Sequence, residues 1–114
     1  MALADNILTV GGNAMAAVIT HVSLHTAGAV TSSTSESAAA RRPVVVTSDA
    51  DGDLIIPTAA FTGGAASGAA IRIGYWSALT VGTYYGGALL TGDQAFNAAG
   101  AYTYNGGSET STAT

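Results

Sequence analysis

Charged side chains are scarce in this sequence. Lysine is absent, and Arg41, Arg42 and Arg72 are the only side chains that carry a positive charge when both histidines are neutral. Charged residues make up 9% of the chain, whereas about 25% is typical of a soluble domain. Nucleic acids and anionic membranes are bound through clusters of Lys and Arg, and this chain has a formal net charge of −4. We therefore expect no nucleic-acid partner and no membrane partner.

Several other features are missing, and each absence excludes a class of function. The sequence contains no cysteine, which rules out disulfides and thiolate metal sites. No run reaches the roughly 18 apolar residues of a membrane span. The apolar segment 1–22 has no basic leader and contains Asp5, so we do not expect a secretory signal. Phosphate loops, dinucleotide fingerprints and nucleophile elbows are lacking, and the sequence therefore predicts neither an enzyme nor a cofactor.

The overall composition indicates a protein that associates with others. With 114 residues the chain is long enough for one domain with its own core. Because charge is scarce, Ala, Gly, Ser and Thr must cover most of its surface. Such a surface is a weak barrier to association. This composition favours a protein whose exterior is partly buried by neighbours in an assembly.

Short apolar runs separated by Gly- and Asp-rich turns predict an all-β fold. We expect an antiparallel β-sandwich or small barrel with a short N-terminal helix or arm. The helix or arm spans 1–16, and its partial helical spacing is interrupted at Gly11 and Gly12. The β domain spans 17–105 and carries an exposed Ser/Thr-rich loop at 27–40, which we expect to be ordered only by neighbours. A tail at 106–114 is not expected to fold by itself.

The expected strands alternate in a way that assigns side chains to faces. In the first strand, Val22 and Leu24 share one face, while Ser23 and the two histidines share the other. Adjacent Tyr84 and Tyr85 must point to opposite faces, so one is expected in the core and the other outside. Trp76 is expected in the core. The predicted strands are 17–26, 42–47, 53–57, 70–76, 82–90 and 101–104.

Two groups of side chains have the chemistry of metal ligands. His21 and His25 lie on one face of a predicted strand, but four residues of extended chain separate them by more than about 12 Å. One ion cannot be reached by both, so polar or interface roles are favoured. Asp49, Asp51 and Asp53 match the opening of a calcium loop. Leu54 stands where that loop requires Gly and no Glu closes it, so an Asp–Gly turn is favoured and calcium is the alternative.

Two segments resemble a known group of proteins. The first reads AVITHVSLHTAG at 17–28, followed by Glu36 and then Arg41 or Arg42. The second reads IRIGYWSALTVGTYYGGALLTGDQAFNAAGAYTY at 71–104. Together they are similar to small bacteriophage proteins commonly labelled tail fibre or minor tail protein, in which ITHVSLHTADPG precedes a Gly-Leu-Trp segment and a glycine-bounded strand. Here Tyr75 replaces that Leu, and a Ser/Thr-rich loop replaces the Asp-Pro-Gly turn.

This resemblance implies a non-enzymatic structural protein located in the virion. Its partners would be other virion proteins (the major capsid protein or a tail protein) and further copies of itself. A chain of this length without coiled-coil heptads cannot form an elongated fibre alone. A capsid decoration or minor capsid protein is therefore favoured over a minor tail or tail-fibre component. We expect a trimer, because phage surface proteins often occupy threefold positions.

The sequence also suggests which residues make these contacts. The candidate interface residues are Leu3, Ile7, Leu8, Tyr85, Arg41 and Arg42. Residues 1–15 are expected to pack on another subunit, so that a chain lacking them folds but fails to join the particle. A different class of function, a carbohydrate-binding or host-interaction module, would require Trp76 and Tyr85 to form an exposed stacking platform.

Overall fold

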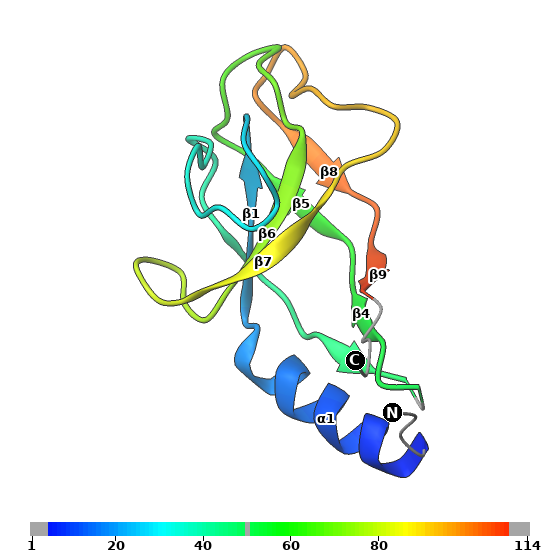
Figure 1. Cartoon of the computed structure of the whole chain (residues 1–114). Helices are drawn as coiled ribbons and strands as arrows, with labels where there is room; N and C mark the ends of the chain where they lie inside the picture. The colour runs from blue at the N-terminus through cyan, green and yellow to red at the C-terminus, as the bar shows by residue number, and fades with distance from the viewer. Residues whose placement is uncertain (1–4, 50, 110–114) are drawn as a thin grey trace.

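The chain folds into a mostly β structure, as the sequence predicts. The computed structural model describes residues 5–49 and 51–109, and in them one helix precedes nine strands (Figure 1). The elements are α1 (Asp5–Val18), β1 (His21–His25), β2 (Arg42–Pro43), β3 (Thr47–Ser48), β4 (Leu54–Ile56), β5 (Ala59–Phe61), β6 (Arg72–Trp76), β7 (Tyr84–Leu89), β8 (Tyr102–Tyr104) and β9 (Gly107–Glu109). All paired strands are antiparallel. They form sheets in the orders β2-β1-β6-β7, β3-β4-β9 and β5-β8.

Helix α1 runs without a break through the two glycines that were expected to interrupt it. The helix lies along β3 and β4, at the end of the molecule opposite the tip of β1 (Figure 1). A Cβ added to Gly12 would lie 2.9 Å from the backbone of Gly52 and would also collide with the hydroxyl of Ser48. Glycine is thus required for close packing of the helix on the β3–β4 turn. The helix continues to Val18, so the first strand begins at His21 and not at residue 17.

The four-stranded sheet is buried on both of its faces in the region of β1 and β6. On one face Val22 lies opposite Tyr75 and Leu24 opposite Ile73. These side chains are at most 5% exposed, and they meet the apolar side chains of the other two sheets. Each fully buried apolar side chain of this kind stabilises the fold by roughly 1.5–3 kcal/mol. The main core also contains Leu54, Ile56, Phe61, Leu90, Phe96 and Tyr104.

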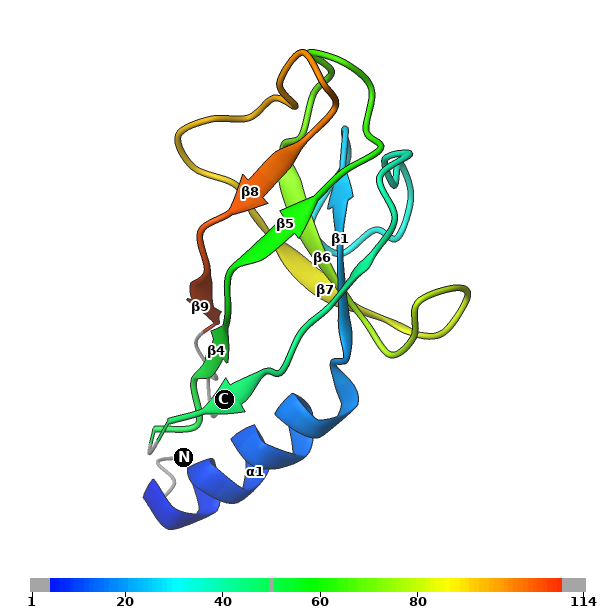
Figure 2. The ribbon, with the colours of Figure 1, turned by 180° about the vertical axis from the view of Figure 1, so that it is seen from behind.

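The region after β1 departs from the predicted strands. The expected strand 42–47 is two short strands, β2 and β3, in different sheets. The β-branched run between them carries the chain from one sheet to the other, with Val46 buried and Val45 81% exposed. Figure 2 shows this crossing from behind, together with β5 beside β8. Strand β5 was not predicted, because its sequence Ala-Ala-Phe lacks the β-branched residues that mark strands.

The C-terminal segment also folds further than expected. Residues 107–109 form β9, which pairs with β4 through Leu54 opposite Glu109. The hydroxyl of Tyr75 donates a hydrogen bond of 2.6 Å to Oε1 of Glu109, which connects β6 to β9. The prediction that the tail 106–114 does not fold is therefore wrong for residues 107–109. Residues 110–114 lie outside the described residues.

Candidate functional site

The second face of the four-stranded sheet carries a group of polar and aromatic side chains. We call this group the buried polar network; it consists of Ser23, His25, Arg72, Trp76 and Tyr84. Strand β1 supplies the first two residues, β6 the next two and β7 the last. In the register of β1 and β6, Ser23 lies opposite Gly74 and His25 opposite Arg72. All five side chains thus come from two sequence segments, 17–28 and 71–104.

A chain of hydrogen bonds fixes the histidine of this network. Nδ1 of His25 lies 2.8 Å from the carbonyl oxygen of Thr34, which can only accept, so Nδ1 carries the proton. In the neutral ring Nε2 then accepts from the hydroxyl of Ser23 at 2.6 Å. The same hydroxyl oxygen accepts from Nε1–H of Trp76 at 2.8 Å. Both ring nitrogens of His25, the Ser23 hydroxyl and the Trp76 N–H therefore each have a hydrogen-bond partner.

Burial keeps His25 neutral and separates it from solvent. Its pKa is lowered from 6.5, chiefly because burial disfavours the imidazolium, with the Arg72 charge acting in the same direction against the opposing hydrogen bond to Thr34. A Ser–His pair can activate a nucleophile, but Ser23 and His25 are both 0% exposed. The pair joins β1 to the loop that covers it, and no substrate can reach either side chain in this conformation.

Arg72 is the fully buried centre of the network. Its guanidinium donates to the carbonyls of Ala27 (2.9 Å), Ser32 (2.7 Å) and Thr34 (2.7 Å), and to the hydroxyl of Tyr84 (2.9 Å). Hydrogen bonds to a charged group contribute about 1.5–3 kcal/mol each. Four of them offset the cost of burying one cation, which is several kcal/mol. The Ser/Thr-rich loop, expected to be ordered only by neighbours, is thus held by an arginine of its own chain.

Tyr84 and Gly74 complete the network. The hydroxyl of Tyr84 donates to the carbonyl of Val30 at 2.6 Å, and its ring meets Trp76 edge-on with centroids 5.1 Å apart. A Cβ at Gly74 would lie 2.6 Å from Nε2 of His25 and 2.8 Å from both the Ser23 hydroxyl and the Tyr84 ring. The glycine of the Gly-Tyr-Trp segment is therefore required to leave room for these side chains.

Arg41 extends the network to a second loop. Its guanidinium carbon lies 3.4 Å from the centre of the Trp76 ring, and it forms a two-pronged ion pair with Glu36. Its Nη1 donates to the carbonyls of Ala78 (3.0 Å) and Val81 (2.7 Å). Because Arg41 is 8% exposed and these donors act within the chain, the structure places it inside and not on a contact surface.

The other candidate interface residues are found in different settings. Tyr85 is 46% exposed, and Tyr84 beside it is half-buried, as expected for adjacent strand residues. Arg42 is exposed on β2. Ile7 and Leu8 lie within α1, but their side chains fall outside the description, and Leu3 precedes the described residues. Trp76 is 7% exposed and covered by Arg41, so the sugar-stacking platform that needed it on the surface is not formed.

The N-terminal helix is part of this chain's own fold. Gly12 and Ala16 are buried, and the helix packs against β3 and β4. Met15 and Val18, by contrast, are 40% and 44% exposed. Removal of residues 1–15 would therefore disturb the β3–β4 region. The sequence-based expectation that a chain lacking these residues still folds is thus revised.

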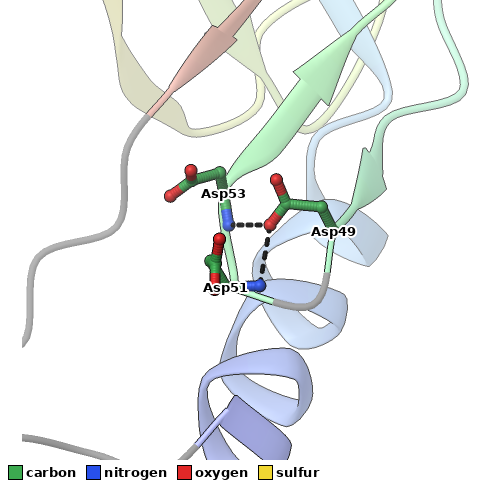
Figure 3. A group of neighbouring side chains, drawn as sticks. All are labelled: Asp49, Asp51 and Asp53. Carbon is green, nitrogen blue, oxygen red and sulfur yellow. Dashed lines mark hydrogen bonds between the residues drawn. The ribbon is translucent and has the colours of Figure 1, made fainter.

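The three aspartates gather at the turn between β3 and β4 (Figure 3). One carboxylate oxygen from each lies within 4.8 Å of the others. Oδ1 of Asp49 accepts from the backbone N–H of Asp51 at 2.9 Å and of Asp53 at 3.0 Å. Leu54, where a calcium loop needs Gly, is buried in the core. The predicted turn is thus present, and Asp49 caps its backbone.

The two histidines are not brought together as a metal site. His21 is half-buried, and its Nδ1 lies 2.9 Å from the hydroxyl of Thr20. His25 uses both ring nitrogens within the polar network. Within residues 5–49 and 51–109, the aspartate turn is the only cluster of three His or carboxylate ligands.

Sequence reasoning missed the internal roles of two arginines. Arg72 stands between Ile71 and Ile73 in a strand of apolar alternation, and it shares a face with Gly74 and Trp76. An isolated arginine in an otherwise apolar strand indicates that its charge is buried and has partners within the same chain. Three of its four partners, however, are backbone carbonyls, which no residue type in the loop reveals.

Comparisons with known proteins leave the chain without an assigned family. No family model matches it, and no curated protein or solved structure shows significant similarity. In the described part of the chain, no helix combines the length and apolar character needed to span a bilayer. The resemblance of residues 17–28 and 71–104 to phage proteins therefore stays a prediction.

Proposed function

We propose that this chain is a non-enzymatic structural protein of a bacteriophage virion, located on the capsid surface as a decoration or minor capsid protein. The observation that carries the proposal is the exposure of large apolar side chains on a surface with little charge. Val81 is 84% exposed, Val45 81%, Leu89 65% and Leu79 52%. Covering one such side chain at an interface yields roughly 1.5–3 kcal/mol.

Two of these side chains stand on a loop that the molecule holds in place. Leu79 and Val81 lie between β6 and β7, in the hairpin loop that projects from the body of the molecule (Figure 1). Arg41 holds two carbonyls of this loop, and Ser77 closes its base by accepting from the Thr83 N–H at 2.8 Å. A fixed apolar loop binds a partner with less loss of entropy than a mobile one.

Backbone strain within this loop supports the same role. Val81 has φ +57°, a left-handed conformation that β-branched residues rarely adopt. The hydrogen bond from Arg41 to its carbonyl helps to maintain that conformation. Strain of this kind is found mainly where a function requires a particular backbone shape. We define the 77–83 loop as the docking loop of the proposed function.

The dimensions of the chain support a position on the shell more than a fibre. The molecule extends 47 Å along its longest axis and 27 and 22 Å along the others. One such unit can cover the joint between neighbouring shell subunits, but it cannot form a long shaft. Small domains that add buried area across joints stabilise a shell against internal pressure.

Immunogold electron microscopy of intact virions with an antibody to this chain tests the proposal. Gold distributed over the head is the expected result, and shells lacking the protein should then disrupt at a lower temperature. Gold confined to the tail or its tip would replace the capsid assignment with a minor tail or tail-fibre component. Purified virions without any label would contradict the virion role altogether.

A further inference from the structure

The two edges of the four-stranded sheet differ in how they are protected. The β2 edge is two residues long and consists of Arg42 and Pro43, a charge and a residue without an N–H. Both devices keep a free edge from pairing with other chains. The β7 edge is six residues long and has neither device. From Ile73 to Gly92 the chain contains no charged side chain.

The register of β7 shows which backbone groups lie on its free edge. The N–H of Leu90 donates to the carbonyl of Ile71 at 2.9 Å, and Leu89 lies opposite Arg72. In an antiparallel ladder, hydrogen-bonded pairs alternate with pairs whose N–H and C=O groups point outward. The outward groups of β7 are therefore those of Leu89 and, two residues earlier, Gly87.

Within residues 5–49 and 51–109, no strand pairs with this edge of β7. Beside it lies a cleft of about 220 Å³, with Ala88 to Thr91 on one side and Asn105 to Glu109 on the other. The Leu89 side chain is 65% exposed. An unprotected strand with outward backbone donors and acceptors can accept one more strand at a spacing of about 4.8 Å.

We propose that the β7 edge pairs with β7 of a second copy of this chain, which gives a continuous antiparallel sheet across a two-fold axis. The strand is complementary to itself: with Ala88 on the axis, Gly87 of each copy exchanges hydrogen bonds with Leu89 of the other. The absence of charge on the strand means that the two copies bring no like charges together. The contact closes with two copies, whereas the sequence-based expectation was a trimer.

Sedimentation equilibrium of the full chain tests this pairing. The expected mass is twice the 11.1 kDa of one chain. Leu89→Lys places a charge on the proposed contact and should weaken association at least about tenfold, because each dimer acquires two such charges. Val45→Lys is the matched control, since Val45 is 81% exposed and lies outside every strand. A monomer, a trimer, or a dimer unaffected by Leu89→Lys would overturn the proposal.

Amide hydrogen exchange of the wild-type chain gives a second test that needs no variant. The outward N–H groups of Gly87 and Leu89 should exchange slowly at high protein concentration and quickly after dilution below the dimer dissociation constant. The N–H of Leu90, which bonds within the sheet, should be protected at both concentrations. Fast exchange of the Leu89 amide in an associated sample would show that the contact lies elsewhere. This result is independent of the position of the protein in a virion.

Discussion

Ser23 and His25, two residues apart on β1, share a hydrogen bond of 2.6 Å between the serine hydroxyl and Nε2 of the histidine. In the neutral ring Nε2 accepts from the serine hydroxyl, because Nδ1 carries the proton that it donates to the carbonyl of Thr34. Protonation of His25 would place a second donor opposite the serine hydroxyl, whose oxygen already accepts from Trp76. The fold is therefore linked to the neutral state of one histidine.

This linkage predicts that the protein loses stability as the pH falls below about 6.5. In the unfolded chain His25 binds a proton near pH 6.5, whereas in the folded chain its pKa is lowered. The neutral histidine contributes its full stabilisation above pH 6.5, and that contribution declines as the pH falls toward the folded-state pKa. Urea unfolding at pH 7.5 and 5.5 should give a smaller free energy of unfolding at the lower pH.

Two variants separate His25 from the other titrating groups. His25→Asn should lower stability at pH 7.5 and remove most of the difference between the two pH values. His21→Asn, on the same strand but outside the polar network, should leave that difference intact. An equal pH dependence in wild type and His25→Asn would show that another group is responsible.

The second prediction concerns Arg72 and the loop it holds. Arg72→Met should lower the free energy of unfolding by about 3 kcal/mol or more, because three loop carbonyls and the Tyr84 hydroxyl lose a buried donor. Amide exchange in residues 26–35 should accelerate more than in β6 itself. Arg42→Met, at an exposed arginine of β2, is the control and should change stability by less than about 0.5 kcal/mol. Similar effects of the two changes would contradict the structural role of Arg72.

The third prediction concerns the space beside the network. Gly74→Ala adds a methyl group within 3 Å of atoms of Ser23, His25 and Tyr84, so we expect a loss of about 1–3 kcal/mol from overpacking. Gly63→Ala is a useful comparison, because a Cβ there meets no atom within 4 Å and its cost comes from φ +82° alone. Trp76 fluorescence should change in the Gly74 variant only. An unshifted spectrum would mean that the network absorbs the methyl group.

The strand pattern of the sequence predicted the central sheet because alternation is a property of the residues themselves. Ile73 and Tyr75 face one side of β6, and Arg72 and Trp76 the other, as the alternation of 70–76 indicates. The burial of Trp76 follows from its size and apolar surface. Such features depend on side-chain chemistry and period, both of which the sequence displays directly.

Other features depend on contacts between distant segments and could not be predicted. The Gly11–Gly12 pair has low helix propensity, but packing of Gly12 against Gly52 favours a continuous helix. Strand β9 reads Gly-Ser-Glu, which has no strand signal, and it forms because β4 offers a free edge. The roles of Arg41 and Arg72 rest in large part on backbone carbonyls that the fold brings near, and a carbonyl is the same in every loop sequence.

The fourth prediction concerns the hydrogen bond between Tyr75 and Glu109. Tyr75 is 5% exposed, and its hydroxyl donates to Oε1 of Glu109 at 2.6 Å. Burial, with the adjacent carboxylate adding to it, raises the pKa of Tyr75 above its usual value of 10. The hydroxyl thus stays protonated and attaches β9 to the central sheet.

Tyr75→Phe keeps the buried ring and removes only this bond, so it should lower the free energy of unfolding by about 1.5–3 kcal/mol, as for a hydrogen bond to a charged group. Amides of β9 should exchange faster, whereas those of β1 should not. Tyr85→Phe removes a hydroxyl from a tyrosine that is 46% exposed and should have almost no effect. If Glu109→Gln added its full cost on top of Tyr75→Phe, the two side chains would not be coupled, and β9 would be held by its pairing with β4 alone.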